Sequence, residues 1–429
     1  MYLPTRYFPS ISGAEFYFQR MAEILSSRYK YKIDIYTSNA IDFKALRDPA
    51  GKVITNNDKD FNTVNSININ RFPIKYDITE DEILQRLKNL QEFKDLNISD
   101  ACTKKLIKNG PYLEDLIENF INKTNLHYEL IHTTFFPYFN LVLSLMIGNY
   151  IEAPTICTPF FHFSNPRYSD SDLIEILKKF DFIIACTTLE KTFLMDKYRF
   201  PEEKIKVIPM GVDYRMFETT YKAKSKNHHF KSKFFDKKEK NHKLVLFCGY
   251  KNYEKGAISI LRSIPFILEK VKKVYFVFIG PSTIAFNHEL TKLRKQVKAK
   301  IINLTPDNLT GYYDKKKIGA FKDADVFLMP SRSDAFGIAF LEAWSSATPV
   351  IGANVGATPE VIRENVDGLL AEFDNPRDIA QKALKLLKSK KLRENLGTMG
   401  QSKVAQNYTW DIIAKKTHDI YQKILKAKN

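Results

Sequence analysis

The chain has 429 residues, of which 44% are hydrophobic and 13% aromatic. It is therefore long enough for two domains with separate cores and too apolar to be disordered. No apolar run approaches the roughly 18 residues that span a bilayer, and the opening residues lack the apolar stretch of a signal peptide. Lysine and arginine outnumber aspartate and glutamate by 66 to 49, a formal charge of +17. That charge suits a polyanionic partner such as an anionic membrane surface, nucleic acid or a phosphorylated substrate.

A short loop precedes the first expected helix. Residues 7–15 read YFPSISGAE, and Ser12 with Glu15 makes the S-x-x-E pattern of a capping box before a helix over residues 16–26. Gly13 opens the first turn, where the lack of a side chain allows close approach to the backbone. Little chain precedes Tyr7 for a first strand, so the natural chain is expected to begin upstream.

Two histidines follow strands in the first half of the chain. Strands are expected at residues 126–132 and 154–158, and they lead to His132 and His162. A histidine at the carboxyl end of a parallel strand can orient a substrate hydroxyl. A histidine that only completes hydrogen bonds within the core explains either position equally well.

Residues 218–243 form a basic linker in this interpretation. Nine lysines lie between residues 222 and 243, and Phe230, Phe234 and Phe235 stand among them. A solvated hinge is one reading of this composition. Phenylalanines among lysines also suit peripheral attachment to an anionic membrane surface.

A loop with two lysines follows the first strand of the second half. The strand is expected at residues 243–249, and a helix runs from Gly256 to about residue 271. Lys255 at the helix N-terminus opposes the helix dipole, so it fits beside a bound anion, although a solvated lysine is an alternative. Lys251 adds a second positive charge to the same loop.

The stretch from 325 to 362 carries the most informative pattern. A strand at 325–329, a loop, a helix beginning between 335 and 337, and a strand at 349–351 make a unit of a parallel α/β sheet. The helix is apolar on nearly every side, so Glu342 is expected to be buried. No lysine or arginine stands three or four residues away, and hydroxyls of a ligand are expected to satisfy its carboxylate. A distant arginine is the alternative.

The start of that helix can hold an anion. The amides of Phe336, Gly337 and Ile338 are expected in the first turn, where unpaired N–H groups and the helix dipole favour negative charge. Asp334 stands just before the helix, either as its N-cap or facing a ligand. A sugar, a diphosphate and a ribose laid end to end would use Asp334, the amides and Glu342.

This arrangement resembles a known family. Seven residues separate Asp334 from Glu342. This spacing resembles the acidic-x7-Glu motif of glycosyltransferase family 4. The members of this family are retaining glycosyltransferases of the GT-B fold, also called glycosyl transferases group 1. The family usually has glutamate at the first position. Its glycine-rich loop resembles the segment around Gly13, and its lysine–glycine pair resembles Lys255 and Gly256. Tyr250 stands where the family has arginine.

The resemblance implies an α/β fold with GT-B architecture: two Rossmann-like parallel-sheet domains facing a central cleft. Residues 1–217 would form the acceptor-binding domain, completed by a C-terminal helix over residues 410–429. Residues 244–409 would bind the nucleotide-sugar, a nucleoside diphosphate sugar.

The implied activity is transfer of a hexose, with retention of anomeric configuration, to a glycan, a lipid-linked or another hydroxyl acceptor. Asp334 would be catalytic without forming a covalent intermediate, and His162 would at most orient the acceptor. The expected donor-binding residues are Gly13, Lys251, Lys255, Phe336, Gly337, Ile338 and Glu342.

Other motifs and readings limit this hypothesis. The sequence has no G-x-G-x-x-G, P-loop or H-E-x-x-H motif, and its Asp-x-Asp triplets follow no apolar strand, so we expect no metal and no other cofactor. Cys102, Cys157, Cys186 and Cys248 have no paired spacing, which indicates reduced thiols and a cytoplasmic location, dissolved or peripheral on the membrane. The alternatives are a DNA-modifying glucosyltransferase of GT-B fold, although a nucleic-acid partner is not expected, and a non-catalytic GT-B scaffold.

Overall fold

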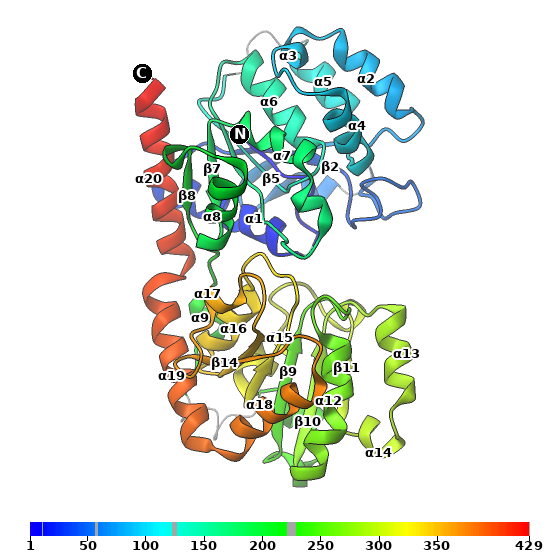
Figure 1. Cartoon of the computed structure of the whole chain (residues 1–429), viewed down its shortest axis with the longest axis vertical. Coiled ribbons are helices and arrows are strands. Elements are labelled where there is room, and N and C mark those ends of the chain that lie inside the picture. The colour runs from blue at the N-terminus through cyan, green and yellow to red at the C-terminus, as the bar shows by residue number, and fades with distance from the viewer. Residues whose placement is uncertain (11, 56–58, 122–126, 221–228, 429) are drawn as a thin grey trace. The chain divides into compact units, whose positions relative to one another are not determined.

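The structure is a computed structural model that describes the chain except residues 11, 56–58, 122–126, 221–228 and 429. The chain divides into two compact units (Figure 1). The N-terminal unit holds Met1–Pro209 and Trp410–Asn429, and the C-terminal unit holds Met210–Thr409. No helix among the described residues is long and apolar enough to cross a membrane.

The N-terminal unit is built on an eight-stranded sheet in the order β3-β4-β2-β1-β5-β6-β7-β8. Its strands pair in parallel except at the edge, where β3 is antiparallel to β4. The strands are β1 Tyr2–Leu3, β2 Asp34–Ser38, β3 Thr63–Val64, β4 Ile67–Phe72, β5 Ile131–Thr134, β6 Thr155–Thr158, β7 Phe182–Ala185 and β8 Ile205–Val207. The helices are α1 Gly13–Tyr29, α2 Glu80–Lys88, α3 Gln91–Lys94, α4 Asp100–Asn109, α5 Glu114–Ile121, α6 Asn140–Tyr150, α7 Ser171–Lys178, α8 Thr188–Tyr198 and α20 Trp410–Lys428.

The last helix completes this unit although it comes from the far end of the chain. Helix α20 packs against α1. The Tyr421 hydroxyl lies 2.9 Å from the Tyr2 hydroxyl and 2.5 Å from Nδ1 of His132. Buried hydroxyls need such partners, so these contacts tie α20 to the middle of the first sheet.

The C-terminal unit has a six-stranded, wholly parallel sheet in the order β11-β10-β9-β12-β13-β14. Its strands are β9 Lys243–Cys248, β10 Val274–Ile279, β11 Ile301–Leu304, β12 Val326–Leu328, β13 Val350–Ala353 and β14 Gly368–Ala371. Its helices are α9 Tyr214–Phe217, α11 Lys231–Phe234, α12 Ala257–Lys270, α13 Ile284–Lys292, α14 Lys295–Lys298, α15 Lys315–Asp323, α16 Ile338–Ser345, α17 Thr358–Val361, α18 Pro376–Lys388 and α19 Lys390–Asn407.

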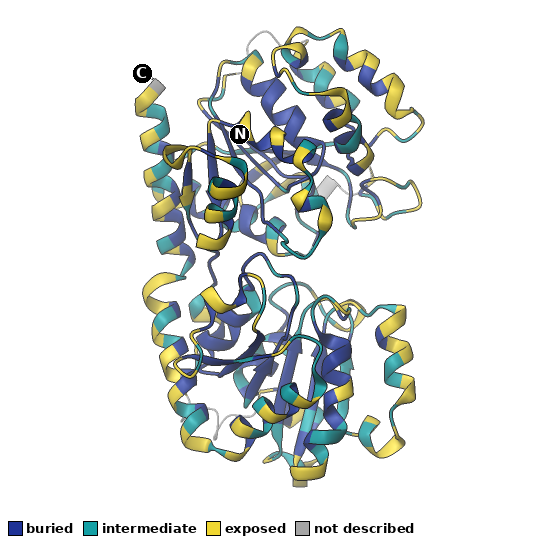
Figure 2. Ribbon diagram, viewed as in Figure 1, coloured by how far each residue is buried: buried dark blue, intermediate teal, exposed yellow. Residues whose placement is uncertain are grey.

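Strand composition explains why these sheets lie inside their units. Strand β9 reads KLVLFC and β10 reads VYFVFI, continuous apolar runs that suit a sheet covered on both faces. Figure 2 shows the strands of the C-terminal sheet mostly buried, while its outer helices turn exposed residues to solvent. The strand order reverses between β9 and β12, and ligands of such sheets bind at the carboxyl ends of the strands beside that reversal.

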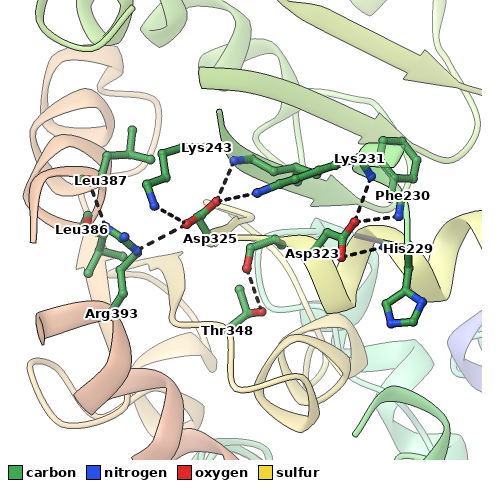
Figure 3. Close-up of polar contacts among 12 residues, drawn as sticks. His229, Phe230, Lys231, Lys243, Asp323, Asp325, Thr348, Leu386, Leu387 and Arg393 are labelled. Atoms are coloured by element: carbon green, nitrogen blue, oxygen red, sulfur yellow. Dashed lines mark hydrogen bonds and ion pairs between the residues drawn. The ribbon is translucent and has the colours of Figure 1, made fainter. Parts of the chain in front are cut away.

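The described part of the predicted linker is not a hinge. The backbone N–H groups of His229, Phe230 and Lys231 donate to the Asp323 carboxylate at 3.1, 2.6 and 2.8 Å (Figure 3). Phe230 and Phe235 are buried, so they are not available to a membrane. Residues 229–243 therefore belong to the C-terminal unit, and the interpretation of these two phenylalanines as membrane contacts is wrong. Residues 221–228, with three of the nine lysines, lie outside the described residues.

The first helix begins differently from the prediction. Helix α1 starts at Gly13, and the Ser12 hydroxyl bonds to the Glu15 carboxylate instead of capping a backbone amide. Glu15 also pairs with Arg6, at 2.6 Å between Oε1 and Nη2, with both side chains 4% exposed. The predicted capping box is wrong because Arg6 holds the Glu15 carboxylate within the unit.

Candidate active site

Two loops meet where the strand order of the C-terminal sheet reverses. One joins β9 to α12, and the other joins β12 to α16. Gly256, in the first loop, has a φ of 72°, and a Cβ atom there would lie 2.3 Å from the Pro330 carbonyl oxygen. Only glycine allows this approach.

Hydrogen bonds and an ion pair join the same loops. The Glu254 carbonyl accepts from the Arg332 N–H at 2.8 Å and from the Ser331 hydroxyl at 3.1 Å. The Arg332 guanidinium also forms an ion pair with the Glu254 carboxylate, with Nε 3.0 Å from Oε2. These contacts fix the positions of the neighbouring residues Lys255 and Asp334.

Lys255 and Asp334 form the first acid–base pair of the site. The ammonium donates to Asp334 Oδ2 at 2.8 Å and to the Ser333 carbonyl at 3.2 Å, and the two side chains are 22% and 15% exposed. An ammonium has three N–H groups, so Lys255 retains one donor for an anion. Asp334 caps no helix; its carboxylate faces Lys255 instead.

Helix α16 begins at Ile338, directly after Gly337. Gly337 is its N-cap with a φ of 95°, a conformation that glycine adopts without strain. The helix starts at Ile338, so the prediction that Phe336 contributes to its first turn is wrong. The Phe336 ring is buried and packs against Tyr408, with ring centroids 5.6 Å apart. The amides of Gly337 and Ile338 remain at the positive end of the helix.

Glu342, four residues into α16, is buried as predicted but already has a cation. Lys317 of α15 places its Nζ 2.7 Å from Glu342 Oε1, and the side chains are 8% and 2% exposed. The prediction that ligand hydroxyls satisfy the carboxylate is therefore incomplete: a distant basic side chain, the alternative, pairs with Glu342, with lysine in place of the expected arginine. Nothing local marks Lys317 as the partner of Glu342, because it is the last of three consecutive lysines, residues 315–317.

Tyr312 covers this pair. Its ring lies 3.6 Å from Lys317 Nζ, and its hydroxyl bonds to Glu342. Burial, and then the negative charge of Glu342, raise the pKa of Tyr312 far above its usual value. The phenol thus keeps its proton and donates a hydrogen bond to the carboxylate.

Lys251 does not face the site. Its side chain is fully buried, and its Nζ donates to the Ser282 hydroxyl at 3.2 Å, the Leu304 carbonyl at 2.8 Å and the Asn303 side chain. Burial lowers its pKa to about 8. All three donors are engaged within the fold, so the predicted donor-binding role of Lys251 is wrong.

Gly13 and His162, the remaining predicted residues, lie in the N-terminal unit. Gly13 is exposed at the start of α1. His162 is half-buried, with its ring edge-on to Tyr168 at 5.4 Å. His132, by contrast, is a core residue: its Nε2 lies 2.8 Å from the Thr158 hydroxyl, and burial lowers its pKa to about 3.

The acids of the site are paired with lysines rather than gathered around a common point. Across the part of the chain that the structure describes, no three histidine, cysteine, aspartate or glutamate side chains form a group that could hold a metal ion. What the site offers chemically is two carboxylates, a partly exposed ammonium and the amino end of a helix.

Known families match both halves of the chain. The model described as "Glycosyltransferase Family 4" matches residues 95–215, and that described as "Glycosyl transferases group 1" matches residues 229–403. A glycosyltransferase of Methanocaldococcus jannaschii without an assigned role is 31% identical over 228 residues, which are 52% of this chain and 55% of that protein. Spore coat protein SA of Bacillus subtilis is 28% identical over 52% of this chain and 61% of its own length. The chain thus spans a little over half of these two relatives.

Solved structures agree on the fold. HepE of Anabaena, crystallised with UDP-glucose, superposes with a TM-score of 0.69 at 14% identity, over 98% of this chain and 99% of that one. With two Rossmann-like units and matches to both family descriptions in the same chain, the protein belongs to glycosyltransferase family 4 and has the GT-B fold.

Proposed function

We propose that this protein is a retaining glycosyltransferase that moves a hexose from a nucleoside diphosphate sugar to a hydroxyl of a glycan or lipid-linked acceptor. The observation that carries the proposal is the placement of Lys255, Asp334 and the amino end of α16 on two joined loops where the strand order reverses. The complex of HepE with UDP-glucose supports a donor of this class.

Each part of the donor has a matching group. The Glu342 carboxylate accepts hydrogen bonds from the ribose hydroxyls, and Lys255 with the amides of Gly337 and Ile338 binds the diphosphate. Asp334 binds hydroxyls of the transferring sugar and stabilises positive charge on its ring. These roles follow the order of the groups along the loop and the helix.

The same groups favour retention without a covalent sugar–protein intermediate. Retaining glycosidases use two carboxyl groups about 5 Å apart, one of them a free nucleophile. Glu342 is 2% exposed and bound to Lys317, so it is not free to attack a sugar. The departing phosphate, stabilised by Lys255 and the helix amides, then takes the proton of the acceptor hydroxyl. Attack comes from the face that the phosphate leaves, and the new bond keeps the donor's configuration.

Two measurements test the proposal. Thermal unfolding of the full chain is recorded with UDP, GDP, ADP and their sugars; a ligand at 100 times its Kd stabilises the folded state by about 2.7 kcal/mol. NMR of the linkage formed from the donor that binds then gives the configuration of the product. Absence of stabilisation by every nucleotide would refute donor binding, and an inverted product would refute the mechanism.

A further inference from the structure

Lys317 differs from the two lysines before it. It lies in α15, where Lys315 is exposed, Lys316 is half-buried and Lys317 is buried. Its ammonium is surrounded by aromatic rings, 3.6 Å from the centre of Tyr312, 5.7 Å from Phe217 and 5.9 Å from Phe321. Cations bind to such ring faces when water is excluded.

Glu342 is the one carboxylate that pairs with Lys317 in the part of the chain that the structure describes. Hydrophobic side chains of similar volume often stabilise a fold as well as a buried ion pair does, because both charges of the pair lose water. Stability therefore gives no reason to bury this pair as a whole. A requirement for a carboxylate in one fixed orientation does, because Lys317 holds Glu342 at Oε1.

The carboxylate has acceptor capacity left. Two carboxylate oxygens offer about four lone-pair sites. Lys317 occupies one on Oε1, and the Tyr312 hydroxyl occupies another. Two sites remain, which equals the number of hydroxyls that a ribose 2′,3′-diol presents.

We propose that Lys317 is a positioning residue of the donor site: it holds the Glu342 carboxylate in the orientation that receives the two ribose hydroxyls, while Tyr312 shields the pair from water. This inference rests on the proposed function, because it assigns the ribose of the donor to Glu342. Lys317 itself touches the carboxylate and not the reacting atoms.

The test compares two probes, UDP and 2′,3′-dideoxy-UDP, by calorimetry on the full chain at pH 7. If another nucleoside diphosphate binds in the thermal screen, its dideoxy form is used in the same way. The ratio of the two Kd values isolates the contribution of the ribose hydroxyls, because the base and the phosphates are the same in both probes. For the unaltered protein we expect a ratio of about tenfold or more, since the hydroxyls bond to a charged group.

In Lys317→Met the Glu342 carboxyl loses its partner at Oε1 and is no longer held in one orientation, so it binds the two ribose hydroxyls less strongly. We expect the ratio to fall to about threefold. The matched control is Lys315→Met, an exposed lysine of the same helix, which keeps the original ratio. If Lys317→Met does not fold, Lys317→Gln takes its place with the same expectation.

The outcomes separate this inference from the proposed function. A folded Lys317 variant with the original ratio overturns the role of Lys317 and leaves donor binding intact. A ratio near one in the unaltered protein overturns the assignment of ribose to Glu342, again with nucleotide binding intact. If no nucleoside diphosphate binds the unaltered protein, the proposed function and this inference fail together.

Discussion

The two ends of strand β12 carry contrasting charge clusters. Just before the strand, Asp325 lies among three cations: Lys231 Nζ at 3.1 Å, Lys243 Nζ at 3.0 Å and Arg393 Nε at 3.6 Å (Figure 3). Beyond the other end, Asp334 and Glu342 each pair with a single lysine. The first cluster has more positive charges than its carboxylate needs, whereas the second has carboxylates with acceptor capacity left.

This difference separates a structural cluster from a binding site. Burial tends to raise the pKa of Asp325, but Lys231, Lys243 and Arg393 outweigh it and hold that pKa below its usual value. Asp325 thus stays charged and joins α11, β9 and α19 around the start of β12. A buried acid alone does not indicate function; unused hydrogen-bonding capacity beside a strand-order reversal does.

The largest effect on stability is expected at Asp325, the carboxylate that lies among three cations. Asp325→Asn leaves three cations close together without their carboxylate, and breaking a buried pair of this kind costs about 3–5 kcal/mol. Urea unfolding measures the loss of stability. Affinity of the remaining folded protein for UDP should not change, because Asp325 lies at the opposite end of the strand from the site. A loss of stability below about 1 kcal/mol would show that the two clusters do not differ in this way.

The next effect is expected at Glu342. Glutamine at this position still accepts from Lys317 through its carbonyl oxygen, so the loss of stability should be smaller than for Asp325→Asn. Binding of the donor should weaken about tenfold or more, since hydrogen bonds to a charged group contribute roughly 1.5–3 kcal/mol. Calorimetry with UDP measures this on the folded variant. Unchanged affinity would remove Glu342 from the donor site.

Lys255→Ala should affect binding with little change in stability. The pair with Asp334 is partly exposed, and such pairs contribute about 1 kcal/mol or less. Loss of the ammonium beside a diphosphate should still weaken donor binding about tenfold. Calorimetry and urea unfolding on one sample separate the two effects. A large loss of stability with unchanged affinity would place Lys255 with Asp325 as a structural residue.

The sequence predicted the fold and part of the site. Length indicated two domains and the pattern at residues 325–351 a parallel sheet, while the pair of Rossmann-like domains was expected from the resemblance to the family; the apolar surroundings of Glu342 predicted its burial. The partner Lys317 could not be predicted, because it lies 25 positions before Glu342, with strand β12 between them, and nothing local marks its direction. The linker prediction failed for a related reason: Asp323, which binds the N–H groups of residues 229–231, stands more than 90 residues away.

Lys251 extends the comparison to a lysine with no carboxylate. Its three acceptors are neutral, and burial lowers its pKa to about 8 from the ordinary 10.5. The sequence predicted a donor-binding charge here, because lysine is rarely buried and Lys251 lies in the same loop as Lys255. Below pH 8 the folded state bears the full unfavourable free energy of a buried ammonium.

The sign of the resulting pH dependence follows from proton binding. Between pH 8 and 10.5 the unfolded state holds the Lys251 proton more tightly than the folded state, so stability due to this group rises with pH across that window. The unfolding free energy of the unaltered protein, minus that of Lys251→Met, should therefore increase between pH 8 and 9 by about 1 kcal/mol. Other titrating groups cancel in this difference, and the same difference taken with Lys315→Met should stay constant. A difference that is flat or falls with pH would mean that Lys251 keeps its charge in the fold, and that neutral acceptors can hold an ammonium as firmly as the carboxylates at the ends of β12 do.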